Sequence, residues 1–266
     1  MRGRVLIVAG SDSGGGAGIQ ADIKTVTMLG AYAATAITAL TAQNTEGVFG
    51  VLPVPPEFIR RQIEVVLDDI GADAIKTGML HDAAVIDTLA AVLAERAGDL
   101  PLIVDPVMAA KGGARLIDPE AVGALKQLLI GRATVLTPNL PEAEILCGMA
   151  IGDIAAMRRA GEALLALGCR GVLVKGGHLA GNVVSDVLVT ETGVRVWESP
   201  RLATRHTHGT GCTLASAIAA GLAQGLAVEN AVERAREYVL RAIASAPGLG
   251  RGHGPLNHAH PLDSRQ

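Results

Sequence analysis

A glycine-rich turn leading into an apolar helix is the segment of this chain with the clearest chemical potential. It reads His206-Thr-His-Gly-Thr-Gly-Cys212, and residues 213–226 that follow are small and mostly apolar. Free N–H groups at a helix start bind anions, and the helix dipole adds to the attraction. Cys212 lies in the first turn, where the same field favours its thiolate. The pattern indicates either a phosphate site with a potential base, typical of phosphoryl transfer, or a helix entry that packs closely against a strand.

Three polar residues near predicted strand ends could face a metal ion. Asp105 directly follows an apolar run, where an unpaired charge is costly, and Asn139 and Glu142 flank the sequence Asn-Leu-Pro-Glu. In kinases Mg²⁺ bridges and neutralises phosphates, and it uses few protein carboxylates together with several waters. The alternative is that Asn139 or Glu142 only caps a helix, which is the commoner use of such residues.

Two further side chains could contact a ligand. Lys175 ends an apolar run and precedes two glycines, so its ammonium could reach a β- or γ-phosphate or could simply be solvated. Gln43 carries an amide that could read a donor–acceptor edge of a heterocycle, or it is an ordinary loop glutamine.

A second glycine-rich loop spans residues 10–18 and follows the first predicted strand. It lacks the spacing of a dinucleotide-binding loop, because Ile19 stands where the last glycine would be when counted from Gly14. It also lacks the Gly-Lys-Ser/Thr of a Walker A motif. The loop could bring backbone amides to a ligand, fold as a lid, or merely connect flexibly to a helix at Ile19.

The elements that must position these residues alternate between strands and helices. Short apolar, β-branched-rich runs predict strands at 5–9, 74–77, 102–104, 134–136 and 171–174. Helical spacing predicts helices at 56–70, 83–97, 119–129, 154–167 and 228–246, with Asp82, Asp118 and Asp153 at three helix starts. This order favours an α/β fold with a mainly parallel sheet and helices on both faces. Because such sheets bind ligands beyond the carboxyl ends of their strands, the candidate residues should meet at one rim.

Two segments depart from this alternation. Residues 33–41 and 48–53 predict a pair of short strands, and 183–190 with 194–198 predict a hairpin around Glu191-Thr-Gly193. The glycine-rich tail after Pro247 is expected to be irregular. With no linker, repeat or low-complexity stretch in the sequence, we expect a single domain over residues 1–266.

The composition excludes several classes of protein. Hydrophobic residues make up 49% and aromatic residues 2%, so the core must consist of Ala, Val, Leu and Ile. A net charge of −3 and few aromatic side chains argue against a nucleic-acid partner. Three widely spaced cysteines do not make a disulfide framework, and no apolar run is long enough to span a bilayer. We expect a cytoplasmic protein without a membrane partner.

Six segments, in order along nearly the whole chain, carry a resemblance to a known family. They are residues 9–25, Asp105-Pro-Val-Met108, Thr137-Pro-Asn-Leu-Pro-Glu142, Lys175-Gly-Gly-His178, His206-Thr-His-Gly-Thr-Gly-Cys212 and residues 252–258. In combination they resemble the thiamine-pathway hydroxymethylpyrimidine/phosphomethylpyrimidine kinases, which have the ribokinase-like fold. The resemblance implies a three-layer sandwich and ATP- and Mg²⁺-dependent phosphorylation of 4-amino-5-hydroxymethyl-2-methylpyrimidine and then of its monophosphate.

The resemblance also implies a role for each candidate residue. The substrate ring would contact Gln43, Gly10, Met79 and Val107. The transferring phosphate would bind at Gly209, Thr210 and Gly211, and Cys212 would take the hydroxyl proton. ATP would contact Lys175, Asn139 and Thr210, while Asp105 and Glu142 would organise the metal.

The resemblance leaves two alternative functions open and also implies an oligomeric state. The wider ribokinase-like group usually has Asp where Cys212 stands, so the cysteine argues against a sugar kinase. Related enzymes phosphorylate pyridoxal, which makes a pyridoxal or pyridoxine kinase the enzymatic alternative. A non-catalytic pyrimidine-binding sensor is the other. The resemblance further implies a homodimer.

Overall fold

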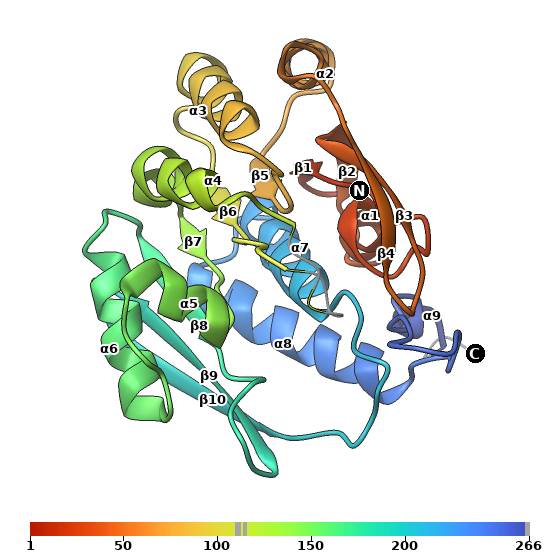
Figure 1. Cartoon of the computed structure of the whole chain (residues 1–266), viewed down its shortest axis with the longest axis vertical. Coiled ribbons are helices and arrows are strands. Elements are labelled where there is room, and N and C mark those ends of the chain that lie inside the picture. Colours follow the sequence, from red (N-terminus) through yellow and green to blue (C-terminus); the bar gives the residue numbers. More distant parts are fainter. Residues whose placement is uncertain (110–112, 114–115, 264–266) are drawn as a thin grey trace.

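An eight-stranded sheet forms the centre of the computed structural model, which describes residues 1–109, 113 and 116–263 (Figure 1). The strand order is β10-β9-β8-β7-β6-β5-β1-β2. The strands β8, β7, β6, β5, β1 and β2 pair in parallel with their neighbours in this order. Strand β9 runs antiparallel to both β8 and β10. Their bounds are β1 Arg4–Ala9, β2 Tyr32–Ile37, β5 Ala74–Thr77, β6 Leu102–Val104, β7 Val135–Leu136, β8 Gly171–Lys175, β9 Val183–Thr190 and β10 Gly193–Pro200.

Helices cover both faces of the sheet, as the sequence predicts. One face packs against α1 (Gly18–Met28), α7 (Thr210–Ala223) and α8 (Val228–Ala244). The other face packs against α2 (Pro56–Asp69), α3 (Ala83–Arg96), α4 (Pro119–Ala124), α5 (Leu140–Cys147) and α6 (Ile154–Leu165). A short helix, α9 (His260–Asp263), lies in the otherwise irregular C-terminal segment. The result is a three-layer sandwich.

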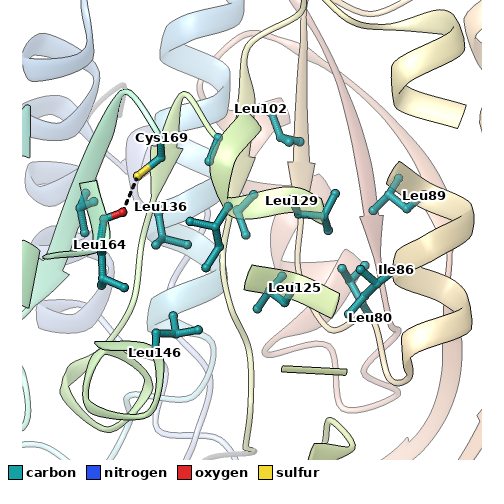
Figure 2. Packing of buried hydrophobic residues seen from close by; sticks show 14 of the residues in the cluster. Leu80, Ile86, Leu89, Leu102, Leu125, Leu129, Leu136, Leu146, Leu164 and Cys169 are labelled. Atoms are coloured by element: carbon teal, nitrogen blue, oxygen red, sulfur yellow. Dashed lines mark hydrogen bonds between the residues drawn. The ribbon is translucent and has the colours of Figure 1, made fainter. Parts of the chain in front are cut away.

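The core is built almost entirely from aliphatic side chains. Leu125, Leu129 and Leu136 are 0–2% exposed and pack between the sheet and the helices on one face (Figure 2). In the same cluster Cys169 donates a weak hydrogen bond from Sγ to the Leu164 carbonyl at 3.4 Å. Burial raises the pKa of the Cys169 thiol to about 11, so this cysteine serves as a small core residue.

Helix α7, which begins at the rim of the sheet, is deeply buried along most of its length. Residues 213–221 are all buried, and most are Ala, Ser or Gly. These small side chains let α7 pack closely against both α8 and the strands β1, β5 and β6. A Cβ on Gly221, for example, would lie 2.8 Å from the Cβ of Ala231 in α8. The N-terminus of α7 is thereby held at the centre of the sheet's rim.

Most predicted elements are confirmed to within two residues, and the hairpin at β9–β10 is confirmed as well. Asp82 and Asp153 cap α3 and α6, accepting from the Val85 and Ala156 amides at 2.9 and 2.6 Å. Asp118 precedes α4 but makes no side-chain capping bond. The helix predicted at 119–129 begins as α4 and continues as a π-helical turn, Leu125–Leu129.

One predicted strand is wrong. The run 33–41 is not a single strand but two: β2 joins the edge of the main sheet, and β3 (Ala39–Gln43) pairs with β4 (Val48–Pro53) in a separate ribbon. The chain changes sheets at Thr38, whose hydroxyl donates to the Met79 carbonyl at 2.6 Å. This ribbon carries Gln43 to the rim of the main sheet, and Figure 1 shows it in orange near the C-terminal segment.

Two further observations concern the ends and surface of the chain. Residues 264–266, the last of the single domain expected from the sequence, lie outside the described residues. Among the described helices none combines the length and the apolar character needed to cross a membrane.

Candidate active site

A cavity of about 890 Å³ opens at the carboxyl ends of the parallel strands. All twelve site residues predicted from the sequence line it: Gly10, Gln43, Met79, Asp105, Val107, Asn139, Glu142, Lys175, Gly209, Thr210, Gly211 and Cys212. They come from the loops after β1, β5, β6 and β7, from β3, from the end of β8 and from the starts of α5 and α7. The convergence expected at one rim is therefore present.

The Gly209-Thr210-Gly211 turn begins α7 at the floor of the cavity. Gly209 is the N-cap and has φ +81°, a left-handed conformation that glycine adopts at little cost. A Cβ there would collide with the Gly16 carbonyl, so the turn and the first glycine-rich loop are in close contact. The Thr210 hydroxyl donates back to the Thr207 carbonyl at 2.7 Å. The turn thus presents a helix start, with its orphan N–H groups, to the cavity.

Cys212 is a thiol in this environment, contrary to the thiolate that the helix field alone predicts. Burial raises its pKa to about 12, and the carboxylates of Asp22 and Asp105 act in the same direction. The ammonium of Lys76 opposes them but does not prevail. The sequence argument failed because it weighed the helix dipole without the cost of burying a charge.

Lys175 and Asp105 form an ion pair on one side of the turn. Lys175 Nζ donates to Asp105 Oδ1 at 3.0 Å, and the Thr137 hydroxyl donates to the same oxygen at 3.0 Å. Asp105 is 2% exposed. Burial opposes the charge on Lys175, but Asp105 and Glu142 outweigh it and raise the pKa of the ammonium. A Cβ on Gly211 would lie 3.2 Å from Lys175 Nζ, so the ammonium lies beside the anion turn.

Asn139 and Glu142 form a capping box at the start of α5, which is the helix-capping alternative left open by the sequence. Asn139 Oδ1 accepts from the Glu142 amide at 2.9 Å, and Glu142 Oε2 accepts from the Asn139 amide at 2.8 Å. Burial raises the pKa of Glu142 to about 7, with Asp105 adding to the effect and Lys175 opposing it. The box fixes Glu142 beside Asp105. The negative charge of the Glu142 carboxylate is only partly compensated by its hydrogen-bond donors and by Lys175.

Gly10 and Met79 lie together at the other end of the cavity. A Cβ on Gly10 would be 2.9 Å from Met79 Cε, the flexible end of that side chain, so the two residues are in close contact. Gln43 reaches the same region from β3, with its amide 3.2 Å from His208.

Two buried pairs of polar residues at the cavity were not predicted from the sequence. Lys76 and Asp22 are both fully buried, and Lys76 Nζ donates to Asp22 Oδ2 at 2.8 Å. Asp22 also accepts from the Ser216 hydroxyl at 2.7 Å, one helical turn beyond Cys212 in α7. The second pair is Asp12 and His208, with His208 Nε2 2.8 Å from Asp12 Oδ2. Lys76 lies within an ordinary apolar strand run, and no local pattern in the sequence distinguishes it.

An anion turn, a lysine and two buried carboxyl groups at the rim of a largely parallel sheet place the chain among the kinases of the ribokinase-like fold. The model of the family described as phosphomethylpyrimidine kinase matches residues 12–257. The chain belongs to this family.

Individual relatives agree with the assignment. The hydroxymethylpyrimidine/phosphomethylpyrimidine kinase of Streptomyces coelicolor is 50% identical over 97% of this chain and 95% of its own length. The thiamine biosynthesis bifunctional protein ThiED of Geobacter sulfurreducens is 54% identical over 97% of this chain, which spans 52% of that longer protein. Among solved structures, the pyridoxal kinase of Bacillus subtilis in complex with ADP has a TM-score of 0.90 and is 38% identical, with 97% of this chain and 98% of that chain covered.

Proposed function

We propose that the chain uses ATP to phosphorylate 4-amino-5-hydroxymethyl-2-methylpyrimidine and then phosphorylates the monophosphate to the diphosphate. The observation that carries the proposal is the single cavity that brings an anion turn, a lysine, two carboxyl groups and an amide-bearing side chain together. The family assignment and the names of its relatives support the same reaction. These relatives are named as kinases, which disfavours a non-catalytic sensor.

The residues divide the cavity into two parts. Gln43, Gly10, Met79 and Val107 would hold the pyrimidine ring, with the amide of Gln43 pairing to its polar edge. This places the hydroxymethyl group toward the start of α7.

At the α7 end, the N–H groups of Gly209, Thr210 and Gly211 would hold the transferring phosphate. Lys175 would neutralise phosphate charge, with Asn139 and Thr210 lining the nucleotide end. Cys212, in its thiolate form, would accept the hydroxyl proton as the first transfer proceeds. The second acceptor is a phosphate oxygen, which already carries negative charge because a monoester's second pKa is about 6.

The donor set at the rim fits Mg²⁺. Asp105 and Glu142 are 2% and 6% exposed, and their mutual repulsion contributes to the raised pKa of Glu142. Mg²⁺ uses few protein carboxylates and keeps several waters, so two carboxyl groups are enough to hold it. Asp105 and Glu142 would hold the ion, and the ion would neutralise charge on the ATP phosphates.

The test is a product assay with purified protein, ATP, Mg²⁺ and hydroxymethylpyrimidine. We expect the monophosphate to form first and the diphosphate to follow, resolved by anion-exchange chromatography. Accumulation of the monophosphate without diphosphate would contradict the second half of the proposal. Omission of Mg²⁺ should abolish both products.

Pyridoxal is the second candidate acceptor, because the ADP-bound pyridoxal kinase of Bacillus subtilis has nearly the same fold. Like the pyrimidine, pyridoxal is a six-membered aromatic ring bearing a hydroxymethyl group. Competition between the two acceptors in one reaction mixture decides between them. A kcat/KM for pyridoxal above that for the pyrimidine would make this the main function.

We also propose that the chain is a single domain that forms a homodimer. The two core clusters share one sheet, which supports a single domain and predicts one cooperative unfolding transition. Apolar side chains on the β3–β4 ribbon are exposed, with Phe49 at 72% and Leu52 at 65%, and a second copy would cover them. Light scattering should give about twice the chain mass of 27.2 kDa. A monomeric mass would refute the dimer.

A further inference from the structure

The carboxylate of Asp12 is the most highly coordinated side chain at the cavity. Its Oδ1 accepts from the Gly14 amide at 2.8 Å, and its Oδ2 accepts from the Gly16 and Ala17 amides at 3.0 and 2.7 Å. The His208 imidazole adds a fourth contact, Nε2 to Oδ2 at 2.8 Å. Asp12 is 1% exposed, yet these donors compensate its charge. Burial would raise the pKa of Asp12, but the His208 and backbone donors outweigh burial and lower it.

The position of a proton on His208 follows from this contact. A carboxylate oxygen only accepts hydrogen bonds, so the imidazole nitrogen 2.8 Å away must carry the hydrogen. This holds for the neutral ring and for the imidazolium alike, because both can bear a hydrogen on Nε2. The backbone of His208 is held as well, because its main-chain N–H donates to the Gly254 carbonyl at 3.2 Å. His208 therefore directs its one Nε2–H toward Asp12.

The amide of Gln43 lies beside the same ring nitrogen. Gln43 Nε2 is 3.2 Å from His208 Nε2, and Gln43 Oε1 is 3.4 Å from Thr41 Oγ1. Two N–H-bearing nitrogens facing each other repel. The Thr41 hydroxyl is already engaged as a donor to the Ser11 carbonyl at 2.9 Å. A half-turn of the amide improves both contacts. Oε1 then faces the Nε2–H of His208, whose single hydrogen it shares with Asp12 Oδ2, and Nε2 donates to the Thr41 oxygen.

This orientation matters because a glutamine amide carries a hydrogen-bond acceptor on one side and a donor on the other. A half-turn exchanges its donor and its acceptor at nearly the same positions. A free amide can therefore pair with an aminopyrimidine edge and equally with the reversed edge of the corresponding pyrimidinone. Gln43 alone cannot discriminate between the two rings, so any discrimination requires a group that prevents the half-turn.

We propose that Asp12 and His208 select the aminopyrimidine ring by fixing the orientation of the Gln43 amide. Asp12 keeps the hydrogen on His208 Nε2, and that N–H, shared between Asp12 and Gln43, keeps the amide oxygen toward the imidazole. The amide oxygen then accepts from the exocyclic amino group, and the amide N–H donates to the neighbouring ring nitrogen. Asp12 and His208 are positioning residues in this scheme, which rests on the proposed function because it requires Gln43 to read the ring.

The experiment compares two acceptors that differ only at this edge, the 4-amino compound and its 4-oxo counterpart. We expect the native protein to prefer the amino compound by about 10²-fold or more in kcat/KM, because the oxo compound mispairs two groups. His208→Phe removes the N–H donor and should reduce this preference to within about tenfold. His208→Gln places an amide N–H near the same point and should restore most of the preference. Asp12→Asn should act in the same direction as His208→Phe.

The ratio between the two acceptors is a readout that a purely structural defect would not move, because misfolding lowers both activities alike. Asp153→Asn is the matched control: this exposed aspartate caps α6 through the Ala156 amide but has no histidine partner. It should leave the ratio unchanged. Retention of the full preference in His208→Phe, with the KM for ATP unchanged, would overturn the proposal.

Gln43→Leu separates failure of this inference from failure of the proposed function. If Gln43→Leu abolishes the preference while His208→Phe does not, Gln43 reads the ring with its amide held by another group such as the Thr41 hydroxyl, and only the orienting role of His208 and Asp12 is wrong. If Gln43→Leu itself retains the preference, Gln43 does not read the ring, and both the ring contact and the inference are wrong.

Discussion

Replacement of Cys212 by alanine should separate the two phosphorylations. Attack by the alcohol releases a proton, so it needs a base, whereas the phosphate acceptor already carries negative charge. We expect Cys212→Ala to slow phosphorylation of the alcohol by about 10²-fold or more, the usual scale for lost acid–base assistance. Phosphorylation of the monophosphate depends more on positioning by the α7 turn and should fall much less.

The environment of Cys212 adds a pH dependence with a definite sign. Because burial raises the pKa of the thiol to about 12, the base form is scarce at neutral pH and becomes more abundant as pH rises. At neutral pH the thiolate is a small minority, and well below the pKa its fraction grows about tenfold per pH unit. The kcat for the alcohol should therefore climb between pH 7 and 9 in the native protein and stay nearly flat in Cys212→Ala.

The assay measures initial rates for each acceptor separately, with purified protein at saturating ATP. Cys147→Ala is the matched control, since Cys147 is also a partly buried free cysteine but does not line the cavity. It should leave both rates and both pH profiles unchanged. If both phosphorylations fall by the same factor in Cys212→Ala, the thiol is not acting mainly as a base.

Three further predictions concern other parts of the cavity. Lys175→Met should lower kcat for both acceptors by about 10²-fold, because the charge beside the moving phosphoryl group is lost, and an unchanged kcat would exclude this role. With the pKa of Glu142 raised to about 7, its carboxylate forms only as pH rises through that value, so the Mg²⁺ concentration for half-maximal rate should be higher at pH 6 than at pH 8. Glu142→Gln should remove this difference. Gly209→Ala forces a side chain into the left-handed region at φ +81° and against Gly16, so it should destabilise the protein by about 1–3 kcal/mol in urea unfolding, and an unshifted urea midpoint would show that the contact relaxes freely.

The sequence predicted the layers of the fold well because the hydrophobic pattern is local and regular. Strands such as β5 and β6 are short apolar runs, and helices α3 and α6 begin at capping aspartates, so each could be located without knowledge of the rest of the chain. The division of residues 33–41 into β2 and β3 could not be predicted in this way. The choice between two sheets depends on which distant strand accepts each half, and that is a tertiary property.

The candidate site shows the same division between local and long-range information. All twelve predicted residues line the cavity. Glycine turns and polar residues near strand ends are visible in the sequence, whereas Met79 and Val107 were predicted only from the family resemblance. The Lys76–Asp22 and Asp12–His208 pairs join residues 54 and 196 positions apart, so neither partner stands out locally. The thiol state of Cys212 was missed for a related reason, since the extent of burial is decided by the whole fold.

Helix α7 has a consequence for the motions of the protein. Its residues 213–221 are buried between the sheet and α8, so their amide hydrogens can exchange with solvent only when one of these layers separates. That opening approaches global unfolding, so the anion turn is anchored to one of the slowest-exchanging segments of the chain. The loop at residues 10–18 is less buried and is held by hydrogen bonds, among them those from the Gly14, Gly16 and Ala17 amides to Asp12. In deuterium-exchange mass spectrometry, ligand binding should therefore slow exchange in this loop and leave α7 nearly as it was.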